Sequence, residues 1–406
     1  MPKVSRSVTS WMPPFASHSL RSEPDRATIM TDHELLSRVL ACIDPPARGL
    51  RLVRRNGRVL LGLPPGREAA ARALGLYQPQ RALARLMVTG LRGLARVGLH
   101  GGMLSKIHLT GGPTPMSPAL AGIDPGTCGV LLGSPEHRVR RAIASYRKDG
   151  GWEVAKISYG EAGAGVLEQE ARTLEELHAV AAGVPRLLGL HRGEDVTVLR
   201  MPYLTGTPVS PGESEDALGL LKQWITDQTP KPITEFSEWT AIESALSEFE
   251  TGRGALERLS RERLRPVICH GDFARWNLLR KADGGLVVLD WEWGHPDGMP
   301  GIDLVHYFLQ DARLVERLSP VDAIRKTCLI LETPGCRDYL DKTGWSGDPL
   351  LPIIASLAYK QGAEHQENGE MIEEILNFGW EEEDAARWLS PSKGGAAPPG
   401  QHANEG

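Results

Sequence analysis

The chain has 406 residues, of which 41% are hydrophobic and 24% charged, a composition typical of a globular protein with about two or three domains. Its formal net charge of −5 excludes a globally basic surface, so no nucleic-acid partner is expected. Five cysteines without a CxxC pair favour reduced thiols and a cytoplasmic protein over a disulfide scaffold or a zinc finger, and no run of 18 apolar residues predicts a membrane span.

The two ends of the chain differ from the rest in composition. Residues 1–22 combine basic and serine residues with no acidic residue and no apolar core, which is compatible with a transit peptide. We favour a simpler interpretation, in which 1–29 is a disordered leader or a mis-assigned start, because a well-formed helix begins just after Met30. Residues 390–406 are rich in Gly, Ala and Pro, which predicts a disordered tail.

Residues 30–118 are interpreted as a basic, mainly helical accessory segment that ends at a Gly- and Pro-rich boundary. A helix over 81–97 would carry an arginine stripe on one face, formed by Arg81, Arg85, Arg92 and Arg96. The opposite face would be apolar, with Leu83, Leu86, Met87, Leu94 and Val97. One interpretation is a peripheral contact with an anionic membrane surface or another polyanion. We favour the other, in which the apolar face packs on the main domain and the arginines are solvated.

Residues 119–205 show the short apolar runs and turn residues of a small antiparallel sheet. Strands are predicted over 129–133, 140–147, 152–157, 186–190 and 196–201, with one helix over 166–182. The glycine-rich stretch 160–165 is not in G-x-G-x-x-G register and is expected to be a mobile loop.

Residues 206–389 have mostly helical periodicity, interrupted by a β-rich stretch over 267–293. There an apolar strand leads into a loop that bears Asp272 and, five residues later, Asn277. A hairpin then returns a buried strand that ends on Asp290. Two carboxylates and one amide would thereby meet at the edge of an apolar core. Such oxygen ligands suit Mg²⁺, and a carboxylate can accept a hydroxyl proton.

The spacing His270-x-Asp272-x₄-Asn277, followed by Leu-Asp290-Trp-Glu, resembles the catalytic and metal loops of the aminoglycoside phosphotransferase and choline kinase superfamily. The resemblance extends over roughly residues 129–389. It implies an α+β, bilobal, protein-kinase-like fold, with a small antiparallel-sheet N-lobe containing one helix, a larger helical C-lobe, and the N-terminal segment as an extension.

The resemblance also implies roles for individual residues. Asp272 would be the catalytic base, and His270 would brace its loop by hydrogen bonding. Arg275 would either stabilise the transferred phosphoryl group or face solvent. Asn277 and Asp290 would bind Mg²⁺, with Glu292 as a further metal or substrate ligand or a surface residue. The remaining matches are Lys156 for the ATP phosphates, Glu170 as its ion-pair partner in preference to Glu168, Glu175 or Glu176, Met201 and Tyr203 in the linker that binds adenine, and Asp303 as a buttress of the catalytic loop.

The expected activity is transfer of the γ-phosphoryl group of ATP, with Mg²⁺, to a hydroxyl of a small molecule. Nine acidic residues within 361–390 favour a cationic acceptor such as an amino sugar or a choline-like alcohol, although solvated helix faces are the simpler explanation. A sugar or a lipid-linked sugar is a further acceptor class, and it would suit a membrane-peripheral protein. Two alternatives stay open: a catalytically silent nucleotide-binding pseudokinase, and a metal-dependent hydrolase using His270, Asp272, Asp290 and His295. The sequence predicts no particular oligomeric state.

Overall fold

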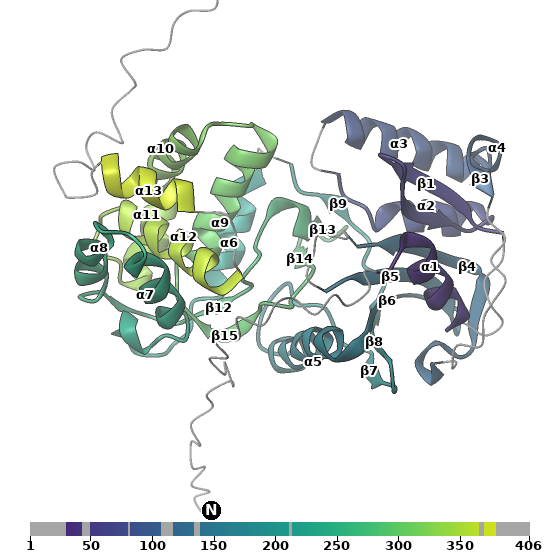
Figure 1. Cartoon of the computed structure of the whole chain (residues 1–406), viewed down its shortest axis with the longest axis horizontal. Coiled ribbons are helices and arrows are strands. Elements are labelled where there is room, and N and C mark those ends of the chain that lie inside the picture. The colour runs from purple at the N-terminus through teal and green to yellow at the C-terminus, as the bar shows by residue number, and fades with distance from the viewer. Residues whose placement is uncertain are drawn as a thin grey trace, which may run out of the picture.

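The computed structural model describes residues 30–42, 49–79, 82–106, 117–133, 139–210, 213–364 and 369–378. A sheet-rich lobe from the first half of the chain stands beside a helical lobe from the second half (Figure 1). The predicted bilobal α+β fold is therefore confirmed. The predicted leader over 1–29 and the predicted tail over 390–406 lie outside the described residues.

The sheet lobe is built on one antiparallel sheet of eight strands in the order β3-β1-β2-β4-β5-β6-β8-β7. The strands are β1 (Arg51–Arg55), β2 (Arg58–Leu63), β3 (Ser105–Lys106), β4 (Ile123–Leu132), β5 (Arg141–Lys148), β6 (Gly151–Tyr159), β7 (Gly189–Arg192) and β8 (Val196–Pro202). The last five correspond to the five predicted strands.

The first three strands correct the expectation of a separate segment over 30–118. β1 and β2 form a hairpin at Asn56-Gly57, where both residues have a positive φ, as a two-residue type I′ turn requires. β2 then pairs with β4 through Leu61↔Leu131. Leu61 is completely buried, so this pairing is part of a hydrophobic core. The sheet therefore continues across the expected boundary at residue 118.

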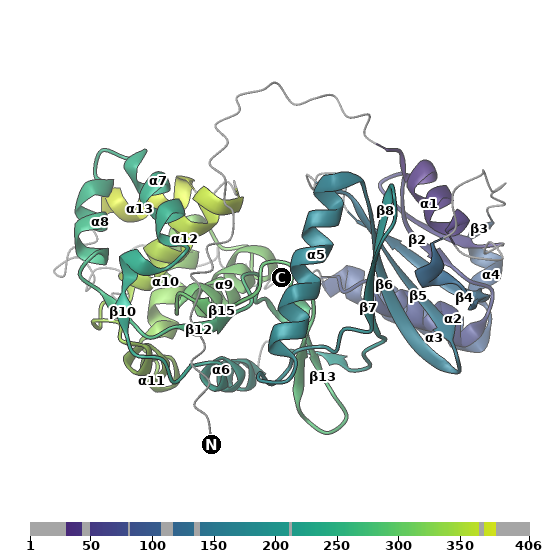
Figure 2. The ribbon, with the colours of Figure 1, turned by 90° about the horizontal axis from the view of Figure 1, so that it is seen from below.

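Five helices accompany this sheet: α1 (Asp32–Ala41), α2 (Arg67–Gly75), α3 (Ala82–Val97), α4 (His100–Met103) and α5 (Gly160–Leu177). The helix expected after Met30 is α1, and it begins with a capping box in which the Thr31 and Glu34 side chains each accept the other residue's backbone N–H. α5 lies on the side of the sheet that faces the helical lobe (Figure 2).

The glycine-rich stretch 160–165 forms the first turns of α5, so the expected mobile loop is wrong. Gly163 makes this start possible because the helix runs very close to β6. A Cβ atom at position 163 would lie 1.9 Å from Ser158 Oγ. The glycine therefore serves close packing between helix and strand.

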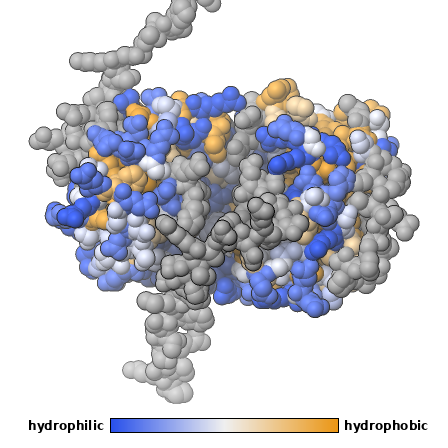
Figure 3. All heavy atoms as spheres, viewed as in Figure 1, coloured by the Kyte–Doolittle hydropathy of each residue, from blue (hydrophilic) through white to orange (hydrophobic). Residues whose placement is uncertain are grey.

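α3 is oriented opposite to the favoured expectation. Four of the five apolar side chains that were expected to pack on the domain are exposed, namely Leu83 (71%), Leu86 (69%), Met87 (68%) and Val97 (58%), whereas Leu94 is half-buried. Figure 3 shows hydrophobic surface where α3 lies, at the top of the sheet lobe. Arg85, Arg92 and Arg96 instead line a cavity between the lobes. Arg81 lies outside the described residues. Peripheral contact of residues 81–97 with an anionic membrane surface stays a prediction.

The helical lobe comprises α6 (Ser214–Gln223), α7 (Trp239–Ser247), α8 (Gly252–Leu259), α9 (Ile302–Gln310), α10 (Pro320–Leu331), α11 (Pro334–Thr343), α12 (Leu350–Glu364) and α13 (Gly369–Phe378). Short strands connect them: β9 (Thr207–Pro208), β10 (Lys231–Pro232), β11 (Arg263–Leu264), β12 (Val267–Cys269), β13 (Leu278–Arg280), β14 (Leu286–Val288) and β15 (His295–Gly298). None of the helices in the described ranges is long and apolar enough to cross a membrane.

One hydrophobic core joins the two lobes. It includes Leu167 of α5 and Leu199 of β8 together with aromatic residues of the helical lobe. The Trp224 ring lies 5.4 Å from that of Phe273 and 5.2 Å from that of Trp291. Phe273 follows Asp272 and Trp291 follows Asp290 in the sequence. The same aromatic cluster therefore anchors both loops predicted to carry the chemistry.

Candidate active site

The loop that carries Asp272 is held by hydrogen bonds to its backbone. β12 ends at Cys269, and the N–H groups of His270 and Gly271 donate to the two carboxylate oxygens of Asp303, at 2.6 and 2.9 Å. Asp303 lies in the first turn of α9. Gly271 has a φ of 81°, and a Cβ atom there would lie 2.5 Å from the Trp293 Cβ atom. This turn therefore needs glycine at position 271.

Both ring nitrogens of His270 are occupied by backbone groups. Nε2 lies 2.9 Å from the carbonyl oxygen of Leu289, and the N–H of Asp272 donates to Nδ1 over 3.2 Å. This pair of contacts fits a neutral ring protonated on Nε2, and burial lowers the pKa of His270. Such contacts hold the loop in place and leave neither ring nitrogen free to transfer a proton to a ligand.

Asp272 receives a donor on each carboxylate oxygen. Asn277 Nδ2 donates to Oδ2 over 3.0 Å and to the Asp272 carbonyl oxygen over 2.8 Å, while His306 Nε2 lies 2.8 Å from Oδ1. Burial acts to raise the pKa of Asp272, but His306 and the Lys360 charge outweigh it and hold that pKa well below its usual value. The side chain is still 34% exposed. Asp272 is thus an ionised carboxylate that a ligand can reach.

The β13–β14 hairpin brings Asp290 to the same place. The two strands pair through Leu278↔Val288, and just beyond them the Leu289 N–H donates to the Asn277 carbonyl oxygen over 2.8 Å. Asn277 and Asp290 therefore lie at the same end of the hairpin. The charge of Asp272 acts to raise the pKa of Asp290, as expected for neighbouring carboxylates, although Lys156 and Arg141 make the net shift downward despite burial.

Lys156 connects the two lobes at this point. Its Nζ atom donates to both carboxylate oxygens of Glu170, at 2.6 and 2.8 Å, and to Asp290 Oδ1 at 2.5 Å. Lys156 and Glu170 are buried, and although burial acts against the ammonium charge, Asp290 and Glu170 raise the pKa of Lys156. Of the alternative acids, Glu168 pairs with Arg192 instead.

Glu292 has a partner that the sequence analysis did not single out. The two terminal guanidinium nitrogens of Arg141, at the start of β5, donate to its carboxylate. Burial and the negative charge of Asp290 raise the pKa of Glu292 to about 7, against the effect of Arg141. Glu292 is thus neither a surface residue nor a free metal ligand. No local pattern marks Arg141, because it is 151 residues away from Glu292 in the sequence.

Arg275 also differs from both of its expected roles. It is only 6% exposed, so it does not face solvent, and its Nε atom lies 3.0 Å from both carboxylate oxygens of Asp311. Asp311 thereby balances its charge, and Arg275 is not assigned to phosphoryl stabilisation.

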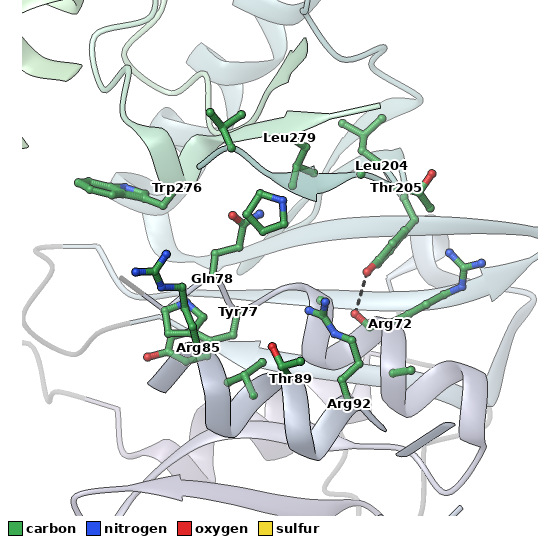
Figure 4. Close-up of a pocket in the computed structure, with 18 of the residues that line it drawn as sticks. Arg72, Tyr77, Gln78, Arg85, Thr89, Arg92, Leu204, Thr205, Trp276 and Leu279 are labelled. Carbon is green, nitrogen blue, oxygen red and sulfur yellow. Dashed lines mark hydrogen bonds between the residues drawn. The ribbon is translucent and has the colours of Figure 1, made fainter. Parts of the chain in front are cut away.

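The linker between the lobes contacts the N-terminal part of the sheet lobe. Met201 pairs with Val154 in the sheet, and the Tyr203 N–H donates to the Trp152 carbonyl oxygen over 2.9 Å. The Tyr203 hydroxyl donates to the carbonyl oxygen of Arg72, on α2, over 2.9 Å (Figure 4). A cavity of about 660 Å³ opens beside this linker, bounded by α2, α3 and the catalytic loop.

Comparison with known proteins supports the resemblance seen in the sequence. The model of the phosphotransferase enzyme family matches residues 149–317, the segment that holds Lys156, Glu170, Asp272, Asn277 and Asp290. No curated protein matches the chain. The matched segment, which spans less than half of the chain, is thus similar to the phosphotransferase enzyme family.

Solved structures with similarity to the chain include three kinases of small molecules. A thermostable mutant of aminoglycoside phosphotransferase APH(4)-Ia, in a ternary complex with ADP and hygromycin B, is 12% identical, with coverage of 65% of this chain and 95% of that chain and a TM-score of 0.40. A putative fructosamine-3-kinase from Haemophilus somnus is 13% identical, with coverage of 61% and 90% and a TM-score of 0.42. Aminoglycoside phosphotransferase APH(3'')-Id from Streptomyces rimosus is 17% identical, with coverage of 54% and 88% and a TM-score of 0.36.

Proposed function

We propose that this protein is an ATP- and Mg²⁺-dependent kinase that transfers the γ-phosphoryl group to a hydroxyl of a small molecule. The observation that carries the proposal is the contact of Lys156, from the sheet lobe, with Asp290, from the helical lobe, beside the carboxylate of Asp272. Phosphoryl transfer depends mainly on positioning and on charge neutralisation, and this group of residues supplies both.

The donor set fits a magnesium ion. Asn277 uses its side-chain nitrogen to bind Asp272, which leaves the amide oxygen as a ligand, and Asp290 adds a carboxylate. Oxygen ligands of this kind are the ones Mg²⁺ prefers. Asn277 and Asp290 would therefore hold the metal, which when bound neutralises charge on the nucleotide phosphates.

The roles of the protein groups follow from their contacts. Asp272 orients the acceptor hydroxyl and accepts its proton on a carboxylate oxygen, while His270 and Asp303 keep its loop in position. Lys156 binds the nucleotide phosphates and is itself held by Glu170. Met201 and Tyr203 belong to the linker against which the nucleotide base would lie.

Contacts of the histidines argue against the metal-dependent hydrolase. His270 has both ring nitrogens occupied, and His295 Nε2 lies 3.3 Å from Glu238, with which it forms an ion pair. Neither histidine is therefore placed to share a metal with Asp272. The pseudokinase alternative differs from the proposal only in whether a phosphoryl group reaches an acceptor.

The test is a mass-spectrometric screen of alcohols, sugars, amino sugars and lipid-linked sugars for an ATP-dependent gain of one phosphoryl group, with and without EDTA. We expect a product that needs Mg²⁺. Asp272→Asn should lower kcat by about 10²–10⁴-fold, because a positioned general base contributes that much, and should leave the Kd for MgATP nearly unchanged.

Asp297→Asn provides the matched control, since this exposed carboxylate in the same lobe pairs with Lys231 away from the site. Full turnover by Asp272→Asn would disprove its role as the base. MgATP binding with no phosphorylated product from any acceptor class would favour the pseudokinase.

A further inference from the structure

The cavity beside the linker has an unusual wall. The residues of α2 and α3 that line it approach the catalytic-loop residue Trp276 and Leu279 of β13 from the opposite side (Figure 4). The described part of the N-terminal region thus forms one side of the cavity. Trp276, which directly precedes Asn277 in the sequence, lies on the other side. A ligand bound there would be adjacent to the loop that carries Asp272.

The charge of this wall is strongly positive. Arginine is its most frequent charged residue, and the arginines that line the cavity are Arg67, Arg72, Arg85, Arg92, Arg96 and Arg275. Glu68 is the only carboxylate among the lining residues, and it pairs with Arg72. Asp311 balances Arg275. Within the described ranges the other four arginines have no carboxylate partner, so the cavity has excess positive charge.

Two buried polar atoms in the wall lack partners. Arg92 uses one terminal nitrogen to donate to the Leu74 carbonyl oxygen over 3.1 Å, but its buried Nε has no hydrogen-bond partner in the part of the chain that is described. The same holds for the buried Oε1 atom of Gln78. An unmade hydrogen bond at a buried atom is costly, so such atoms indicate a missing ligand. One atom is a donor and the other an acceptor, which suits a ligand with both an anionic group and a hydroxyl.

Aromatic groups complete the wall. Trp276, Tyr77 and Tyr203 line the cavity, and the Arg72 guanidinium lies 5.2 Å from the centroid of the Tyr203 ring. Aromatic faces combined with hydrogen-bonding groups suit a polyhydroxylated ligand with an apolar ring face.

We propose that this cavity is a subsite for an anionic group, such as a phosphate, carried by a hydroxyl-bearing phosphoryl acceptor. The inference rests on the proposed kinase function, because only a kinase would use the bound molecule as a phosphoryl acceptor. Tyr203 of the linker lines the cavity, but Lys156, Asp290 and Asn277, which would hold the nucleotide phosphates and the metal, do not. We therefore assign the positive charge of the cavity to a second anion. The acceptor is therefore an acidic or phosphorylated sugar or polyol, not the cationic one that the acidic residues of 361–390 suggested. Most of those acidic residues lie outside the described part of the chain.

The test is calorimetric titration of the full chain with inorganic pyrophosphate, glucose 6-phosphate and glucose, each in the absence and presence of saturating MgATP. We expect the two phosphorylated probes to bind, glucose to bind at least about tenfold more weakly, and MgATP not to displace the probes. Arg92→Gln and Arg85→Gln should each weaken both phosphorylated probes by about tenfold, as expected for loss of one charged hydrogen bond, and should leave the Kd for MgATP unchanged.

Arg253→Gln is the matched control, because Arg253 is an exposed arginine on α8 in the other lobe. Arg85 is exposed, so its variant folds even if the loss of Arg92 disturbs packing. Failure of both phosphorylated probes to bind, or equal weakening by Arg253→Gln, overturns the subsite. Displacement of the probes by MgATP assigns the arginines to the nucleotide and overturns the acceptor assignment. Probe binding by a protein that does not bind MgATP overturns the proposed kinase function and leaves an anion site, a result distinct from the others.

Discussion

Asp272 owes its electrostatic state to neighbours at very different separations in the sequence. Asn277 lies five residues away, and its amide could be anticipated from the loop spacing. His306 lies 34 residues away on α9, and it lowers the pKa of Asp272. His306 touches the carboxylate and not a ligand, so we regard it as a positioning residue.

Removal of His306 should change the pH dependence of the reaction. Burial raises the pKa of Asp272 and His306 lowers it, so His306→Ala should raise this pKa and shift the acidic limb of the kcat/KM profile to higher pH. We expect kcat to fall by about tenfold, at the weaker end of effects on a positioned base. His306→Gln keeps a donor at this position and should restore part of the rate. An unchanged pH profile in His306→Ala would contradict the positioning role.

Predictions for single residues succeeded where the partner is close in the sequence. The contact of Lys156 with Glu170 spans 14 residues, and the inward face of the predicted helix was enough to select Glu170. The contacts of Arg275 with Asp311 and of Glu292 with Arg141 span 36 and 151 residues. Their partners come from the turn just after α9 and from the sheet lobe, so a local pattern cannot identify them.

β6 and α5 are joined by the buried pair of Lys156 and Glu170. Glu170 is fully buried, and its Oε1 atom also accepts the Trp291 N–H over 3.3 Å. The pair therefore fixes α5 against both the sheet and the hairpin that carries Asp290. The free-energy cost of breaking it depends on what remains buried.

Lys156→Met should destabilise the protein by about 3–5 kcal/mol, because it leaves a buried carboxylate without its cation. The double variant Lys156→Met/Glu170→Leu should recover much of that loss while MgATP binding stays weak. Urea unfolding and nucleotide titration measure the two effects separately. Arg192→Met, which breaks an exposed ion pair between β7 and the same helix, serves as the control and should leave the unfolding free energy nearly unchanged. Equal stability of the single and double variants would contradict this account.

The amphipathic pattern of α3 predicted the helix but not its orientation. A helix with one charged and one apolar face usually buries the apolar face. Here the arginine side faces the cavity between the lobes, and Leu83 and Leu86 remain exposed. Periodicity identifies two faces, whereas their surroundings depend on which elements pack nearby.

The sheet lobe extends beyond the matched family segment toward the N-terminus. Three of its eight strands precede that segment by more than forty residues. Leu61 and Leu63 of β2 form a core with α2 that also includes Ala95 of α3. The N-terminal strands thus belong to the structural core of this lobe and hold the arginine wall in place.

Leu61→Ala should therefore lower the free energy of unfolding by about 2–5 kcal/mol, the cost of a buried cavity. Leu86→Ala makes the same chemical change on an exposed face of α3 and should have almost no effect. Thermal unfolding of both variants, followed by circular dichroism, gives the comparison. Equal melting temperatures would show that β2 contributes nothing to the core of the lobe.

Much of this protein could be predicted from short stretches of its sequence. The strand before Asp272, the hairpin to Asp290 and most strands of the sheet follow from apolar periodicity and turn residues, because these are properties of neighbouring residues. The bilobal architecture was predicted from the resemblance to a known superfamily instead. The hairpin at Asn56-Gly57 was not predicted, although an Asn-Gly pair between apolar runs is typical of such a turn. The partners of Arg275 and Glu292, the contact of His306 with Asp272, the packing of α5 on Ser158 and the inward face of α3 could not be predicted in this way. Except for the contact of α5 with Ser158, they depend on segments that are distant in the sequence and meet only in the tertiary structure.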